Sequence, residues 1–190
     1  MTALTLDLGT VNLTDEQYYQ LCIRNENLRF ERNANGDLVI MPPTGGETGN
    51  RNAGITAILW LWNEEKKLGK VFDSSTGFKL PNGADRSPDT AWIPIDRWDA
   101  IPSEKRKKIL PLCPDFVVEL MSPSDTRKDA REKMEEYLEN GTKLGWLMNS
   151  KTKKIEIYRQ NKEVEILENP SVLSGEDVLL EFVLRLARIW

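Results

Sequence analysis

Apolar and polar residues follow periods along this chain that predict both helices and strands. One helix should begin after Thr14, an N-cap residue with Gln17 three positions on, as in a capping box. Longer helical patterns cover residues 47–68, ended by Gly69, and residues 125–140. Two β-rich runs, 28–32 and 37–41, flank an Asn-Gly pair and predict a hairpin. Further strands are expected at 71–80, 88–95, 114–121, 143–149, 153–159 and 163–167, the last three antiparallel to one another.

These elements predict one α/β (α+β) domain spanning residues 1–190, with a curved, mixed, largely antiparallel sheet flanked by helices. A chain of 190 residues can bury one good core, and a second domain is not expected. About ten N-terminal residues are expected to be disordered. The segment 96–112 reads as an irregular or helical connector, and the tail 178–190 fits a strand or a helix equally well.

The composition of the chain excludes several kinds of catalytic and metal site. The chain has no histidine, which excludes Ser-His-Asp catalysis, His-ligated zinc and a histidine base. No apolar run approaches the roughly 20 residues that cross a bilayer, and the N-terminus lacks secretory features, so we expect a cytoplasmic protein with no membrane partner. The net charge of −4 argues against tight non-specific DNA binding. The basic run Lys105, Arg106, Lys107 and Lys108 is either a solvated helix face or a weak nucleic-acid contact.

Two acids stand in apolar runs where a core strand would not place a charge. Asp89 begins one run, and Glu119 lies in the middle of another, between Val117 and Met121 on one strand face. An uncompensated carboxylate in such a setting costs roughly 2 kcal/mol or more. If the two strands pair, both acids could bind one Mg²⁺, with the Leu120 carbonyl as a further oxygen ligand. The alternatives are a turn role for Asp89 and a salt bridge from Glu119 to a core-lining Lys or Arg.

Lys133 borders the inward face of the helix predicted at 125–140. Ala130, Met134, Tyr137 and Leu138 form the apolar stripe of this helix. The ammonium could reach a metal–acid cluster and orient water or stabilise charge on phosphorus. Alternatively, it could extend outward to solvent.

These residues resemble a known group of proteins. Asp89, then Glu119-Leu120-Met121, then Lys133 in the next helix is similar to the PD-(D/E)xK nuclease superfamily. More narrowly, the chain resembles a restriction-endonuclease-like bacterial family long classed as a domain of unknown function. The segments that carry this likeness are Glu31-Arg32 with Gly36–Gly45, Pro114–Asp125, Lys133–Gly141 through Trp146–Asn149, and Ala187–Trp190.

The resemblance implies a restriction-endonuclease-like core and metal binding (Mg or Mn) by Asp89 and Glu119, with lysine assistance. The superfamily pattern places lysine two residues after the acid, where this chain has Met121, so Lys133 must reach in from the helix. Glu31 is an additional acid that could approach the site or could be a surface strand residue.

Three functions agree with these observations to different extents. The first is a Mg-dependent endonuclease that hydrolyses DNA through metal-activated water. Because cutting both strands of a duplex usually needs two sites, this function would favour a homodimer. The second is an inactive nuclease-fold module for binding or assembly. The third, a carboxylate-pair glycoside hydrolase, explains neither Lys133 nor the resemblance.

Overall fold

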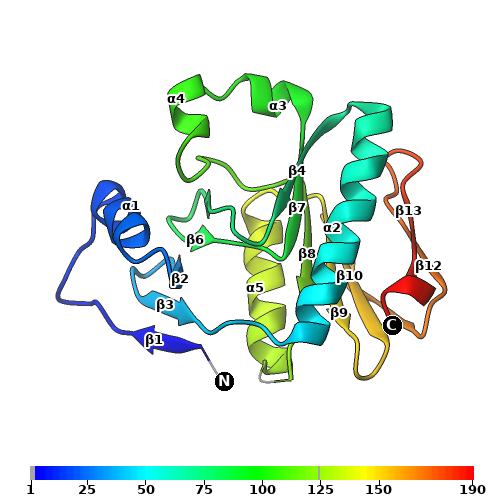
Figure 1. Ribbon diagram of the computed structural model, residues 1–190. Helices are drawn as coiled ribbons and strands as arrows, with labels where there is room; N and C mark the ends of the chain where they lie inside the picture. The colour runs from blue at the N-terminus through cyan, green and yellow to red at the C-terminus, as the bar shows by residue number, and fades with distance from the viewer. Residues whose placement is uncertain (1–2, 124) are drawn as a thin grey trace.

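The computed structural model describes residues 3–123 and 125–190, and its two larger sheets contain most of the strands (Figure 1). The helices are α1 (Asp15–Arg24), α2 (Gly46–Lys66), α3 (Ile95–Asp99), α4 (Ser103–Arg106) and α5 (Arg127–Glu139), with a 3-10 turn η1 (Leu186–Arg188). The capping box at the start of α1 is confirmed, since Thr14 Oγ1 accepts from the Gln17 backbone while the Gln17 side chain accepts from the Thr14 backbone. No described helix is both long and apolar enough to cross a membrane.

The larger sheet runs through the centre of the molecule in the order β11-β10-β9-β8-β7-β4. Its strands are β4 (Gly69–Asp73), β7 (Thr90–Pro94), β8 (Phe116–Leu120), β9 (Leu144–Asn149), β10 (Lys154–Arg159) and β11 (Glu165–Glu168). Only the β8–β9 pair is parallel among these described pairs, and the others are antiparallel. The expected single α/β domain with a mixed, largely antiparallel sheet is therefore confirmed.

A smaller sheet with the order β1-β3-β2-β6-β5 lies to one side of the large one, together with α1 (Figure 1). It consists of β1 (Leu4–Leu6), β2 (Arg29–Arg32), β3 (Leu38–Met41), β5 (Phe78–Lys79) and β6 (Asp85–Arg86). The predicted hairpin is β2–β3, and Gly36 in its turn has a φ of 96°, which favours glycine. Leu4–Leu6 pair with β3, which differs from the disorder expected for the N-terminal residues.

Two helices cover opposite faces of the large sheet, because residues along β8 alternate between its faces. Phe116, Val118 and Leu120 pack in the cluster that contains Ile55 and Leu59 of α2. Val117 packs in the other cluster, which contains Met134 and Tyr137 of α5. The short pair β12 (Val172–Ser174) and β13 (Val183–Arg185) extends the α2 side (Figure 1). The alternation read from the sequence is thus correct, and it places Glu119 on the α5 side.

Several element boundaries differ from the sequence-based expectation. The strand predicted at 71–80 is divided into β4 and β5 by a turn at Asp73, and the tail contains both a strand and a 3-10 turn. Helix α2 ends at Lys66 with Lys67 in the left-handed region, rather than at Gly69. Gly69 instead begins β4, where an added Cβ would lie 2.1 Å from the Ile93 carbonyl oxygen. Its glycine is therefore needed for close strand packing, not for a helix cap.

Candidate active site

The antiparallel pairing of β7 with β8 brings the two predicted acids to the same end of the sheet. The register pairs Thr90 with Val118 and Ala91 with Val117. Extended by one residue, it places Asp89 beside Glu119. The two strands therefore pair, as a metal site shared by Asp89 and Glu119 requires.

Asp89 is held by one hydrogen bond to each carboxylate oxygen. Oδ1 accepts from the Asn52 side-chain amide of α2 at 2.9 Å, and Oδ2 accepts from the Leu120 backbone N–H at 2.8 Å. Burial raises the pKa of Asp89 above its usual value, although the Leu120 hydrogen bond and the Lys133 charge oppose the rise. Asp89 thus connects the start of β7 to the end of β8 and to α2.

Glu119 is a largely buried acid whose side-chain hydrogen-bond and ion-pair partners, among the residues that the structure describes, come from α5. Its Oε1 lies 2.8 Å from Lys133 Nζ and accepts from the Tyr137 hydroxyl at 3.0 Å, and 14% of its side chain is exposed. Burial raises the pKa of Glu119 to about 7, with Lys133 opposing the rise and Asp89 and Glu31 adding to it. The salt bridge to a core-lining lysine, one alternative for this residue, is present.

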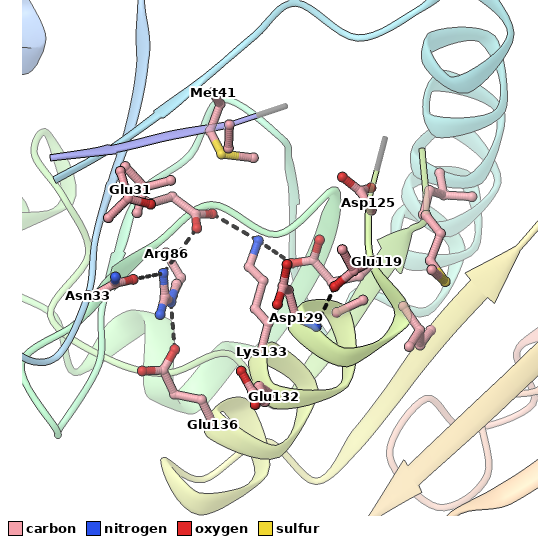
Figure 2. A pocket seen from close by; sticks show the side chains of 18 residues that line it. Glu31, Asn33, Met41, Arg86, Glu119, Asp125, Asp129, Glu132, Lys133 and Glu136 are labelled. Carbon is pink, nitrogen blue, oxygen red and sulfur yellow. Dashed lines mark hydrogen bonds and ion pairs between the residues drawn. The ribbon is translucent and has the colours of Figure 1, made fainter. Parts of the chain in front are cut away.

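Lys133 points inward and bridges two acids, as Figure 2 shows. Its Nζ lies 2.9 Å from Glu31 Oε1 as well as 2.8 Å from Glu119 Oε1, and the side chain is 18% exposed. Burial by itself would lower the pKa of Lys133, but the negative charges of Glu119 and Glu31 together have the larger effect and raise this pKa above its usual value. The outward orientation considered from the sequence is therefore wrong.

Glu31 is a buried residue of β2, not a surface glutamate, with 4% of its area exposed. Oε1 also accepts from the Ser87 backbone at 3.0 Å, and Oε2 lies 3.2 Å from Arg86 Nη1. Burial alone would raise the pKa of Glu31, but Lys133 and Arg86 hold it below its usual value. Arg86 in turn pairs with Glu136 of α5, so the small sheet and α5 share one network of charges (Figure 2).

Glu31, Arg86, Glu119 and Lys133 line a cavity of about 520 Å³ between the small sheet, the end of β8 and α5, whereas Asp89 is not among the described residues that line it. Among the described lining residues, acids outnumber bases. The acids are Glu31, Glu119, Asp125, Asp129, Glu132 and Glu136, and the bases are Arg86 and Lys133. Such a lining favours cations and disfavours a bare phosphate.

The basic run of residues 105–108 lies elsewhere. None of its four residues lines this cavity, although Lys107 and Lys108 line a separate hollow beside α1. Lys107 pairs with Glu104 and Lys108 with Glu16, each at about 3 Å. The predicted nucleic-acid contact of this run stays a prediction.

Sequence reasoning missed three residues that contact the predicted acids: Asn52, Arg86 and Tyr137. The position of Tyr137, four residues after Lys133, was the one available signal, because residues at this spacing share a helix face. Asn52 and Arg86 reach the site only through tertiary packing.

Comparison with known proteins agrees with this architecture. Residues 15–187 match the Uma2 family, which is described as "Putative restriction endonuclease". The chain belongs to the Uma2 family. Its resemblance to the restriction-endonuclease-like group is thereby confirmed.

A solved structure shows the same fold as this Uma2 chain. It is described as a "putative nuclease belonging to DUF820 from Anabaena variabilis ATCC 29413", with a TM-score of 0.72 and 18% sequence identity, and the match covers 84% of this chain and 88% of that one. No curated protein matches the chain.

Proposed function

We propose that this protein is a divalent-metal-dependent nuclease that hydrolyses phosphodiester bonds in DNA. Asp89 and Glu119 hold the ion, which is Mg²⁺ or Mn²⁺, and Lys133 assists. The observation that carries the proposal is the β7–β8 register, which brings both acids to one end of the sheet with Lys133 bound to Glu119. Membership of a family described as restriction endonucleases supports the same class of reaction.

The donor set suits a hard cation that retains water. In residues 3–123 and 125–190, no group of three or more acidic or thiol side chains is arranged to hold a metal. Two carboxylates are present instead, and Mg²⁺ usually accepts one or two and keeps several waters. Because the N–H and C=O of a strand residue face the same neighbouring strand, and the Leu120 N–H donates to Asp89, we expect the Leu120 carbonyl to face the same side and to supply a third oxygen.

A bound dication would lower the pKa of a coordinated water and offset charge on the phosphate. The chain's own residues supply the remaining functions. The ammonium of Lys133 can orient an attacking water and stabilise charge that develops on phosphorus. Glu31 keeps that ammonium inside the cavity and already pairs with two cations, Lys133 and Arg86, so we assign Glu31 to lysine placement rather than to the ion.

Plasmid nicking with Mg²⁺ or Mn²⁺ tests the proposal. The wild type should convert supercoiled DNA to open-circle or linear forms, whereas Asp89→Ala and Glu119→Ala should lose at least about 10²-fold of the rate, the cost of losing a metal's contribution to catalysis. Equal cleavage by all three proteins would indicate a contaminating nuclease and contradict the proposal. Because two-strand cleavage usually needs two sites, sedimentation of the protein with a short duplex should show a homodimer.

A second candidate, an inactive nuclease-fold module for binding or assembly, is favoured by one observation. The lining of the cavity is dominated by acids, and Lys133 already neutralises Glu119. This module would cleave no DNA with either Mg²⁺ or Mn²⁺. Metal-dependent cleavage that is lost in Asp89→Ala would exclude it.

A further inference from the structure

We propose that Asn52 and Tyr137 are positioning residues that fix the orientation of the two acids from opposite faces of the sheet. Asn52 of α2 acts on Asp89, and Tyr137 of α5 acts on Glu119. The inference rests on the proposed function, because it concerns how these acids are presented to a cation.

Tyr137 restrains one oxygen of Glu119 and leaves the other open. Its hydroxyl and the Lys133 ammonium both bind Oε1, and they come from positions four apart on one face of α5. Within the described chain, Oε2 has no hydrogen-bond partner. The ring of Tyr137 is fully buried between the helix and the sheet, so its hydroxyl is held rigidly. Two donors on one oxygen restrict rotation of the carboxylate and leave Oε2 as the oxygen without a described partner, on a side chain that lines the cavity.

Asn52 restrains Asp89 through a relay of neutral groups. The Thr90 hydroxyl donates to Asn52 Oδ1 at 3.3 Å, which requires the amide nitrogen to face Asp89, where it donates to Oδ1 at 2.9 Å. Thr90 itself contacts the Thr56 hydroxyl one turn further along α2, at 2.6 Å. The orientation of the amide is therefore set by contacts on both of its ends.

Both donors are neutral, so they orient the acids without competing for their charge. Lys133 alone would leave Glu119 free to follow the flexible lysine, and the Leu120 N–H alone would leave Asp89 free to rotate about that single bond. Partners of this kind, hydrogen-bonded to metal-binding carboxylates, typically contribute 10-fold to 100-fold to metal affinity. We expect that range here.

Tyr137→Phe tests the first half of the inference because it removes only the hydroxyl and keeps the buried ring. Tyr158→Phe is the matched control: Tyr158 is also buried, and its hydroxyl donates to Glu156 Oε2 at the same 3.0 Å, away from the cavity. Titration calorimetry of Mn²⁺ into the full-length chain should show about 10-fold to 100-fold weaker binding for Tyr137→Phe. Tyr158→Phe should stay within about threefold of the wild type, even if it unfolds at a lower urea concentration.

Asn52→Ala tests the second half, with Asn63→Ala as its control on the same helix. Asn63 is buried and hydrogen-bonds Gly69 and Trp92, so its loss should lower stability without weakening Mn²⁺ binding. Asn52→Ala should weaken Mn²⁺ binding about 10-fold or more. If the alanine variant does not fold, Asn52→Leu, which keeps the side-chain volume, provides the same comparison.

The outcomes separate this inference from the proposed function. Suppose that the wild type binds Mn²⁺ with heat and that Asp89→Ala abolishes this heat. If Tyr137→Phe and Asn52→Ala then bind Mn²⁺ as tightly as the wild type, the positioning roles alone are overturned. No heat in the wild type would overturn both. As an independent readout, saturating Mn²⁺ should restore nicking by Tyr137→Phe toward the wild-type rate, because the variant loses affinity for the ion rather than the ability to react.

Discussion

Lys133 and Glu31 are 102 positions apart in the chain, yet their charged atoms lie 2.9 Å from each other inside the cavity. This ion pair joins α5 to the small sheet, and Arg86 reinforces the junction by binding both Glu31 and Glu136. The small sheet is therefore attached to the rest of the fold partly through charges that also serve the candidate site. Changes to these charges should affect both stability and activity.

Glu31→Ala should destabilise the protein strongly, because it leaves Lys133 and Arg86 buried with one carboxylate fewer. Removing one partner of a buried ion pair typically costs about 3–5 kcal/mol. The free energy of unfolding, measured in urea, should fall by about that amount. Glu47→Ala is the control, since Glu47 also pairs with an arginine but is 87% exposed, and its loss should change the value by less than about 1 kcal/mol. Similar losses in both variants would show that the Glu31 network adds little.

Lys133→Met should reduce DNA nicking at fixed Mg²⁺ by roughly 10²-fold or more, the usual effect of removing one group that stabilises charge in the transition state. The methionine keeps the apolar stem, so the packing of α5 on its neighbours changes little. Lys128→Met removes a lysine of the same helix whose side chain is 82% exposed and should leave the rate nearly unchanged. A wild-type rate for Lys133→Met would reduce Lys133 to a counter-ion of Glu119.

The sequence predicts the elements whose pattern is local. Alternation along residues 116–120 correctly assigns each side chain to one face of β8, and Asn35-Gly36 correctly marks the β2–β3 turn. Strand β6, by contrast, consists of Asp85 and Arg86, two charged residues without an apolar pattern. It exists because its backbone pairs with β2 and its charges meet Arg32 and Glu31. Such a strand depends on tertiary contacts and has no local signature.

The candidate site also contains residues that the sequence reveals and residues that depend on tertiary packing. An acid within an apolar strand is visible in the sequence because burial of a charge is costly, and this marked Glu119. Tyr137 has a helical spacing that also fits an ordinary core residue, and a polar residue such as Asn52 on a long helix is typical of a solvated face. Their contacts with Glu119 and Asp89 follow only from how α5 and α2 pack on the sheet.

Gly69→Ala should destabilise the fold, because the new methyl group would meet the Ile93 carbonyl and the Trp92 ring at 2.1–2.5 Å. A backbone oxygen cannot move aside as a flexible side chain can, so we expect a cost of about 3 kcal/mol or more. Gly46→Ala is the control, since an added Cβ there has no neighbour within 4 Å, and its effect should stay below about 1 kcal/mol. Urea unfolding measures both, and equal stability would show that β4 can shift away from β7.

The raised pKa of Glu119 predicts how stability depends on pH in the absence of divalent metal. Burial moves this pKa from 4.5 to about 7, so the folded protein binds one more proton than the unfolded chain between these values. The contribution of Glu119 to stability therefore falls as pH rises from about 4.5 to 7, by on the order of 3 kcal/mol. Glu119→Gln stays neutral and should lack this dependence.

Between pH 5 and pH 8 in EDTA, the unfolding free energy of the wild type should therefore fall relative to that of Glu119→Gln. Glu132→Gln, which removes an exposed acid from the lining of the same cavity, serves as the reference for a simple loss of charge. A pH-independent difference for Glu119→Gln would mean that Lys133 keeps Glu119 ionised throughout this range. Glu119 would then stay ionised and paired with Lys133, and a cation could bind it only by displacing the lysine.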